Sequence, residues 1–223
     1  MSQHFQTELN NLNERLLTMA SKAEIAVNTA IRALVERDDD LALQVEITDT
    51  EIDQFEIKVD ESAILLLSKA PLARDLRFIT VAMKICTDLE RVGDEATTIA
   101  RRSRELNQEP QLKDYIDIPR MAKMAMDMID QALTAFVNSD AGTAQAVVPK
   151  DKAVDQLNKQ LHRELSSYMV ENPKTISRCL NLMVISKSIE RIADHAKNIA
   201  EVTVYLCNAK DIRHHGQAAA VNE

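Results

Sequence analysis

The sequence predicts an all-α protein made of two tandem, similar three-helix bundles, with six long helices in total. Three observations predict this fold. Glycine and proline are scarce, at 3 and 5 of 223 residues, so turn formers are few and long helices are favoured. Apolar residues recur at helical spacing along most of the chain. The pattern of the first half returns about one hundred residues later.

The first half divides into three helices. The first is expected from about residue 5 to 36, and the aspartates at 38–40 then supply a break and an N-cap. The second is expected from about 40 to 68, and Pro71 separates it from the third, at about 72 to 107. The breaker-rich segment EPQLKDYIDIP follows. We therefore expect a first bundle over residues 1–108, a connection over 109–118 and a second bundle over 119–223.

The second half repeats this plan. We expect a fourth helix from about 120 to 137 and a fifth from about 140 to 170, whose beginning Gly142 and Pro149 disturb. A turn at Asn172-Pro173 leads to the sixth helix, which continues to about 208. The tail HHGQAAAVNE is expected to fray, and its two histidines, His214 and His215, are a weak metal signal. Three amphipathic helices with short connections bury their apolar stripes as an antiparallel bundle.

Charge and composition exclude several classes of function. The net charge of −8 argues against a nucleic-acid partner, which needs a basic surface. The first residues lack the apolar run of a signal peptide, and the longest apolar stretch, 63–67, is too short to cross a bilayer. The three cysteines have no metal-like spacing and are expected to be reduced thiols. These features predict a cytoplasmic protein.

Two nine-residue segments, DLERVGDEA at 88–96 and SIERIADHA at 188–196, place a glutamate four residues before an aspartate on the apolar side of a helix. The preceding helices carry a second pair of acids that also recurs, 102 residues apart. The candidate metal ligands are Glu90, Asp94, Glu190 and Asp194, with Asp49, Asp53, Asp151 and Asp155 on the facing helices. On the second helix the acidic ridge continues to Glu56 and Asp60.

Carboxylates that face one another repel, and burial increases the cost. A bound cation removes both problems, and oxygen ligands suit iron, manganese, magnesium or calcium, and zinc less strictly. No organic cofactor is expected, since the three glycines are too far apart to form a nucleotide-binding loop. The opposing interpretation is a solvated acidic face, or a Glu90 that pairs with Arg74, Arg91 or Arg101.

The segments PLARDLRFITVAMKICTDLERVGDEATTIAR and SIERIADHAKNIAE resemble the two signature segments of the PhoU family, the regulatory proteins of the phosphate transport system. The resemblance covers nearly the whole chain and implies two similar three-helix bundles. It also implies metal clusters on the E/DxxxD motifs: Glu90–Asp94 and Glu190–Asp194, with Asp49–Asp53 and Asp151–Asp155 opposite. The fifth helix departs from the first-half pattern at Asn158 and His162, so the second site is expected to bind metal differently or more weakly.

The same resemblance implies a regulator rather than an enzyme. Such a protein represses the phosphate-starvation response and high-affinity phosphate uptake when phosphate is plentiful. It acts as an adaptor between a sensor histidine kinase and the ATPase subunit of the phosphate ABC transporter. Association with the membrane would be peripheral, through these partners, and the chain would form a homo-oligomer, with a dimer favoured. The sequence does not identify the surface that contacts the partners.

Two other functions remain open. One is a ferritin-like di-metal carboxylate protein for metal storage or redox chemistry. That class needs Glu-x-x-His motifs on two helices, and Gly93 and Ala193 stand where the histidines would be. His195, beside Asp194, is expected at the surface or at a partner contact. The other is a scaffold whose acids form only salt bridges.

Overall fold

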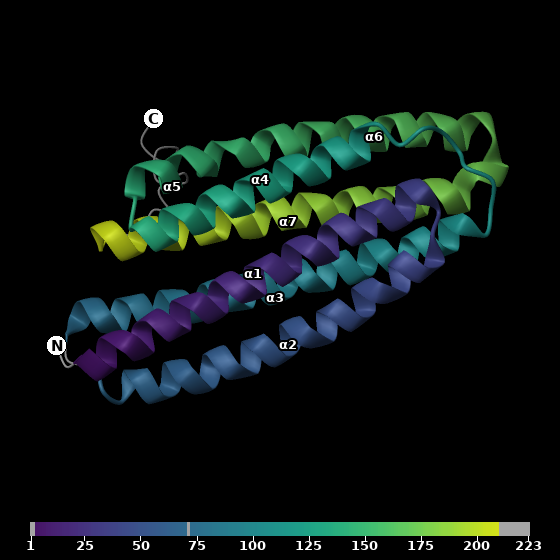
Figure 1. Ribbon diagram of the computed structural model, residues 1–223. Helices are drawn as coiled ribbons and strands as arrows, with labels where there is room; N and C mark the ends of the chain where they lie inside the picture. The colour runs from purple at the N-terminus through teal and green to yellow at the C-terminus, as the bar shows by residue number, and fades with distance from the viewer. Residues whose placement is uncertain (1–2, 71, 210–223) are drawn as a thin grey trace, which may run out of the picture.

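The computed structural model describes residues 3–70 and 72–209, which form seven α-helices and two short 3-10 helices without a β-strand (Figure 1). The all-α prediction is therefore confirmed. Pro71, to which the sequence assigns a helix break, lies outside the described residues, as do the tail and its histidines His214 and His215. Within the described ranges, no helix is both long enough and apolar enough to cross a membrane.

The first bundle consists of α1 (Gln3–Glu36), α2 (Asp39–Leu67) and α3 (Ala73–Asn107), and each of these helices packs against the other two. The chain leaves α1 through Arg37, in the left-handed region at φ 57°. Asp38 then caps α2, because its Oδ1 accepts hydrogen bonds from the backbone N–H groups of Asp40 and Leu41, at 2.9 and 3.1 Å. The predicted break and N-cap are confirmed.

The second bundle consists of α4 (Asp117–Asn138), α5 (Ala141–Val147), α6 (Asp151–Glu171) and α7 (Ile176–Asn208). The predicted fifth helix is divided, because the 3-10 turn η1 (Val148–Lys150), which contains Pro149, separates α5 from α6. A second 3-10 turn, η2 (Pro173–Thr175), replaces the expected turn before α7. The expected start of α4 near residue 120 is wrong. The helix begins at Asp117 and includes Pro119, since a first-turn residue needs no intrahelical N–H bond.

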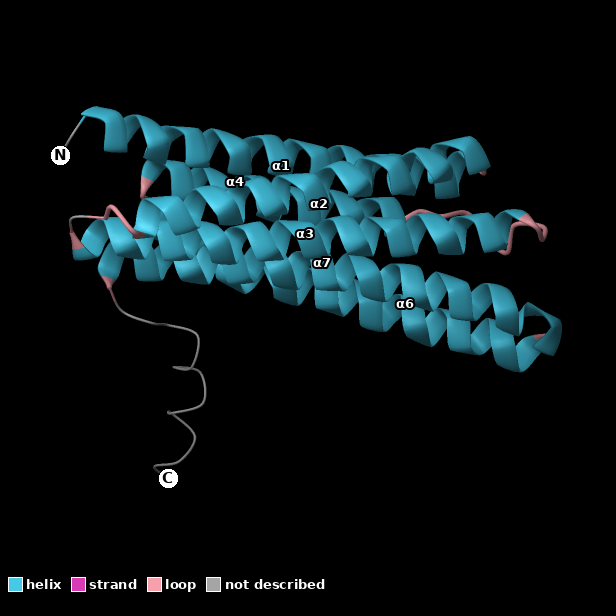
Figure 2. Ribbon diagram, turned by 90° about the horizontal axis from the view of Figure 1, so that it is seen from below, coloured by secondary structure: helices cyan, strands magenta, loops and turns pink. Residues whose placement is uncertain are grey.

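The two bundles pack against each other along α3 and α7, which lie side by side in the middle of an elongated molecule (Figures 1 and 2). The helices α2 and α6 lie at the outer edges in Figure 1. A single cluster of buried apolar side chains extends through both bundles. The acids that the sequence singles out lie on α2 and α3 in one bundle and on α6 and α7 in the other.

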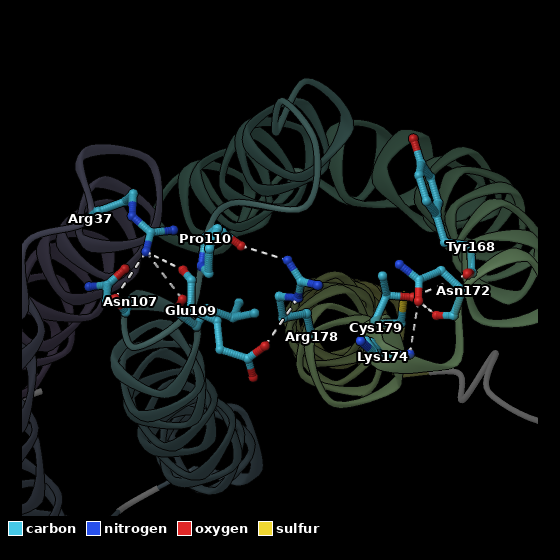
Figure 3. Close-up of polar contacts among 11 residues, drawn as sticks. Arg37, Asn107, Glu109, Pro110, Tyr168, Asn172, Lys174, Arg178 and Cys179 are labelled. Atoms are coloured by element: carbon cyan, nitrogen blue, oxygen red, sulfur yellow. Dashed lines mark hydrogen bonds and ion pairs between the residues drawn. The ribbon is translucent and has the colours of Figure 1, made fainter.

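Arginines from both bundles hold the segment between α3 and α4 (Figure 3). Arg37 Nη2 donates to three backbone carbonyls, those of Leu106, Asn107 and Glu109, at 3.3, 3.0 and 2.6 Å. From α7, Arg178 Nη1 donates to the Pro110 carbonyl at 2.9 Å, and its Nε lies 3.2 Å from a Glu109 carboxylate oxygen. Charged hydrogen bonds from two sides thus fix the connection at residues 109 and 110.

Candidate metal-binding rows

In the first bundle the predicted acids face one another across α2 and α3. We call this set the first acid row: Asp49, Asp53, Glu56 and Asp60 on α2, with Glu90 and Asp94 on α3. Burial is the main cause that raises the pKa of Glu90, to about 7, and the charges of Asp94, Glu56 and Asp53 add to it. The neighbouring Arg91 offsets only part of this effect. The sequence thus correctly places these carboxylates on a shared surface.

Other members of the first acid row show the same effect. Burial, and then the charges of Asp53 and Asp94, raise the pKa of Asp49. The pKa of Glu56 is raised by burial and by Asp60, Asp53 and Asp94. Among the described residues, no lysine or arginine forms an ion pair with Asp49, Asp53, Glu90 or Asp94. The first row is therefore a cluster of negative charge without a bonded counter-charge.

Gly93 lies between Glu90 and Asp94 and permits the close approach of α2. A Cβ at this position would lie 2.9 Å from Asp49 Oδ1 and 3.0 Å from Ile52 Cδ1. The glycine therefore makes room for a carboxylate of the facing helix and for a fully buried isoleucine. Glycine costs about 1 kcal/mol of helix propensity relative to alanine, and the close packing of α2 against α3 offsets this cost.

In the second bundle two of the four corresponding acids, Asp151 and Glu190, have cationic partners. We call Asp151 and Asp155 on α6, with Glu190 and Asp194 on α7, the second acid row. Lys197 Nζ lies 2.5 Å from Asp151 Oδ2, and Lys187 pairs with Glu190. Burial, Glu190 and Asp155 raise the pKa of Asp194, while the two lysines lower it. The two rows thus differ in charge balance, although the sequence motifs repeat.

In the second bundle, hydrogen-bonding side chains stand where α2 carries two further acids. Where α2 carries Glu56 and Asp60, α6 carries Asn158 and His162. Ser186 of α7 donates to Asn158 Oδ1 at 2.8 Å, and His162 Nε2 lies 3.1 Å from the same hydroxyl oxygen. This contact joins α6 to α7 through the buried side chains of Asn158 and Ser186. It agrees with the sequence prediction that the two halves differ at these positions.

Both E/DxxxD motifs have one more buried and one more exposed acid. Glu90 and Glu190 are half-buried, whereas Asp94 and Asp194 are exposed. Of the facing acids, Asp151 is buried, Asp49 and Asp155 are half-buried and Asp53 is exposed. Within residues 3–70 and 72–209, no three histidine, cysteine or acidic side chains converge on a common point as metal ligands do. The acids form rows rather than closed cages, so metal binding by these eight residues stays a prediction.

The α3–α7 contact contains polar groups that the sequence did not identify as partners. His195 Nδ1 lies 2.9 Å from Asp88 Oδ1, and the Asn198 side-chain amide donates to the same oxygen at 3.2 Å. Arg191 pairs with Glu95 at 3.2 Å. His195 is thus half-buried between the bundles rather than at the surface. The available signal was the break in the repeat, where Asp88 corresponds to Ser188 and Glu95 to His195.

The comparison with known families explains the repeated motifs. A model of the PhoU domain matches twice, over residues 16–103 and 118–203. The chain belongs to the PhoU family. Each match contains one E/DxxxD motif together with the helix that faces it, so the duplication read from the sequence is a duplication of the PhoU domain.

Individual PhoU proteins are similar to this chain over nearly its full length. The phosphate-specific transport system accessory protein PhoU homolog of Pseudomonas aeruginosa is 41% identical over 218 residues, which is 97% of this chain and 90% of that protein. The Escherichia coli K12 accessory protein PhoU is 32% identical over 217 residues, again 97% and 90%.

Solved structures support the same fold. The crystal structure of PhoU from Pseudomonas aeruginosa has a TM-score of 0.89 and 40% identity, and the match covers 92% of this chain and 100% of that one. The structure of the phosphate transport system regulatory protein PhoU from Streptococcus pneumoniae has a TM-score of 0.88 and 29% identity, with 93% and 99% covered. The predicted PhoU-like arrangement of two similar bundles is confirmed.

Proposed function

We propose that this PhoU-family chain is an accessory protein of phosphate-specific transport that represses the phosphate-starvation response when phosphate is plentiful. It acts on the cytoplasmic face of the membrane as an adaptor between the ATPase subunit of the phosphate ABC transporter and a sensor histidine kinase. The observation that carries this proposal is the double PhoU-domain match, together with full-length relatives named as transport accessory proteins. An adaptor needs contact surface rather than a catalytic centre.

The outer face of α2 offers such a surface. Large apolar side chains at helical spacing are exposed on it: Leu43, Ile47, Ile57, Ile64 and Leu65, with exposed fractions between 42% and 66%. At about 100° per residue these positions share one face of the helix. An exposed apolar stripe of this kind is typical of a protein–protein contact. We therefore assign the partner contact to α2.

Charge substitutions on this stripe test the assignment. Ile47→Glu together with Ile57→Glu is expected to abolish capture of the kinase or the ATPase while the helices stay folded, as measured by circular dichroism. The control is Val170→Glu on α6, an apolar position that is 85% exposed and lies outside α2. Light scattering on the same samples measures oligomeric state. Suppose instead that the double variant captures the partners as well as the control does and loses only self-association. In that case α2 is the homodimer face and the partner contact lies elsewhere.

The first acid row is the part of the molecule that we propose takes metal ions. Its carboxylate oxygens suit hard divalent or trivalent cations such as magnesium, manganese or iron, and Glu90 and Asp49 lack bonded counter-charges among the described side chains. A bound cation would lower the repulsion that raises the pKa of Glu90. Lysines already serve this purpose in the second bundle. The ferritin-like alternative is not favoured, because neither E/DxxxD motif supplies a histidine ligand.

A genetic experiment tests repression directly. Deleting the gene is expected to leave phosphate-starvation genes active in phosphate-rich medium, and the intact chain supplied from a plasmid should restore repression. A transcriptional reporter measured at high and low phosphate provides the readout. Full repression at high phosphate in the deletion strain would contradict the proposal.

A further inference from the structure

One end of the molecule contains a pocket of about 540 Å³ where the two bundles meet. Residues from the start of α1, the start of α3, the end of α4 and the end of α7 form its walls. Three side-chain amides from α1, those of Gln6, Asn10 and Asn13, line one side. Asp75 and Phe78 of α3 line another. None of these residues belongs to either acid row, so the pocket is separate from the predicted metal ligands.

Asp75 is the charged group of this pocket that lies almost fully inside the protein. Its side chain is 4% exposed, and its Oδ2 atom is buried and has no hydrogen-bond donor among residues 3–70 and 72–209. Arg74 also lines the pocket and forms a long ion pair with the other oxygen, Nε to Asp75 Oδ1 at 3.9 Å, but its side chain is 73% exposed and does not bond Oδ2. Burying an unpaired carboxylate oxygen is costly, so this oxygen is available to a ligand.

A second acceptor lines the same pocket. Asn13 Oδ1 is buried and also has no donor within the described ranges. The partial positive charge at the start of α3 favours a carboxylate at Asp75, but it does not supply a hydrogen to either oxygen. These two buried acceptor oxygens, one of them on a carboxylate, lack donors although Arg74 and side-chain amides also line the pocket. They favour a ligand that donates hydrogen bonds and carries positive charge.

The residue at the corresponding position of the second bundle needs no hydrogen-bond donor from a ligand. Thr175 stands one hundred residues after Asp75 and is also buried. Its hydroxyl donates to the carbonyls of Tyr168 and Asn172, at 3.1 and 2.8 Å, two residues labelled in Figure 3. The second bundle thus satisfies this position with its own backbone. At this position, the first bundle therefore has a buried acceptor without a donor, Asp75 Oδ2, and the second bundle does not.

We propose that the pocket binds an organic ammonium group, with Asp75 as the charged partner and Asn13 as a second acceptor. A primary ammonium has three donors and no acceptor, which matches these two oxygens. The carbon chain of the ligand packs on the apolar part of the wall, which includes Leu9, Phe78 and Leu206. The ammonium can belong to a small free amine or to the lysine side chain of another protein. This site lies outside the proposed adaptor surface on α2.

The full-length protein can be tested with n-butylammonium, and n-butanol serves as the neutral probe of the same length. Titration calorimetry measures affinity, and the expected Kd is about 1 mM for a ligand of so few atoms. Cys207 reports on the pocket itself, because it lines the wall and is half-buried, whereas Cys86 and Cys179 are buried in the core. Saturating n-butylammonium is expected to slow alkylation of Cys207 by N-ethylmaleimide at least threefold. Butanol is expected to have no such effect.

Asp75→Asn should abolish both the heat of binding and the protection of Cys207. The matched control is Asp117→Asn, which removes a first-turn acid of α4 away from the pocket. If Asp75→Asn does not fold, Asn13→Leu provides the second test and should weaken binding about tenfold. Nα-acetyl-lysine methylamide identifies the source, because tighter binding than n-butylammonium indicates a protein lysine and weaker binding a free amine. Equal protection by butanol, unchanged binding in Asp75→Asn, or no protection by either amine would overturn the proposal.

Discussion

A Cβ atom added to Gly93 would lie 2.9 Å from the Oδ1 atom of Asp49. The absence of a side chain on α3 is therefore what allows a carboxylate of α2 to lie against it, between Glu90 and Asp94. In the second bundle the same helix position is Ala193, which is 1% exposed. The first bundle thus uses its glycine to bring acids together, and the second does not.

Gly93→Ala is expected to destabilise the protein, although alanine is the better helix former. The gain in helix propensity is about 1 kcal/mol, but overpacking against Asp49 and the fully buried Ile52 costs roughly 1–3 kcal/mol. A net loss of about 1 kcal/mol corresponds to a decrease in Tm of about 2–4 °C for a chain of this size. Thermal unfolding followed by circular dichroism measures it. Increased stability would show that α2 and α3 do not need this contact.

Stability is expected to fall as the pH rises from about 4.5 to about 7. Glu90 has a pKa of about 7 in the folded chain, against an ordinary value of 4.5. Between these values the unfolded chain has released a proton that the folded chain retains, so raising the pH favours unfolding. The effect is on the order of 1 kcal/mol, because solvent screens a half-exposed group. Burial raises the pKa of Asp49 and Glu56 as well, so they contribute in the same direction.

Glu90→Gln should flatten this decline, and urea unfolding at about pH 5, 6, 7 and 8 measures the slope. Glu61→Gln, an exposed position on α2, provides the control and should leave the slope unchanged. A Glu90→Gln variant with the full pH dependence of the parent would mean that Glu90 is ionised without cost in the folded protein.

Metal binding should depend more on the first acid row than on the second. Glu90→Ala together with Glu190→Ala is expected to weaken binding of manganese while the helical content stays unchanged. Of the two single variants, Glu90→Ala should cause the larger loss, since Lys187 and Lys197 already neutralise acids of the second row. Elemental analysis of protein purified without chelator, followed by manganese titration, measures both. Equal metal content in the double variant and the parent would count against all eight ligands.

Arg37→Met should destabilise the protein by about 3 kcal/mol, because three backbone carbonyls lose a charged donor. The matched control is Arg32→Met. Arg32 is 60% exposed and pairs with Glu36 on the same helix, so its loss should cost between about 0 and 1 kcal/mol. Limited trypsin digestion provides a second readout, since release of the connection should speed cleavage after Lys113. Equal costs for the two arginines would show that Arg37 does not hold the connection.

The helices could be predicted from the sequence because their signals are local. Apolar spacing locates each helix, Asp38 and Asp140 cap the following helices through their own side chains, and Pro149 breaks the predicted fifth helix. The sequence pattern places the start of α4 too late, because Pro119 breaks a helix interior but is tolerated in a first turn. The facing of α2 and α3 acids could be predicted since the same periodicity determines which side of each helix is buried.

Contacts between distant residues could not be predicted in this way. The pairing of Asp151 with Lys197 joins two helices, and only their relative register determines it. The pairing of Glu190 with Lys187 is predictable from the sequence, because side chains three residues apart on a helix are neighbours. Arg37 and Arg178 meet the connection from different bundles, so no local pattern identifies them. That Asp75 Oδ2 and Asn13 Oδ1 lack hydrogen-bond donors depends on how α1 and α3 pack, so no local pattern predicts it.

The most direct test of the adaptor account is a pull-down with the purified full-length chain, the sensor histidine kinase and the transporter ATPase, at high and at low phosphate. The account predicts that the chain captures both partners at high phosphate and releases the kinase or the ATPase at low phosphate. Failure to capture either partner under both conditions would contradict it.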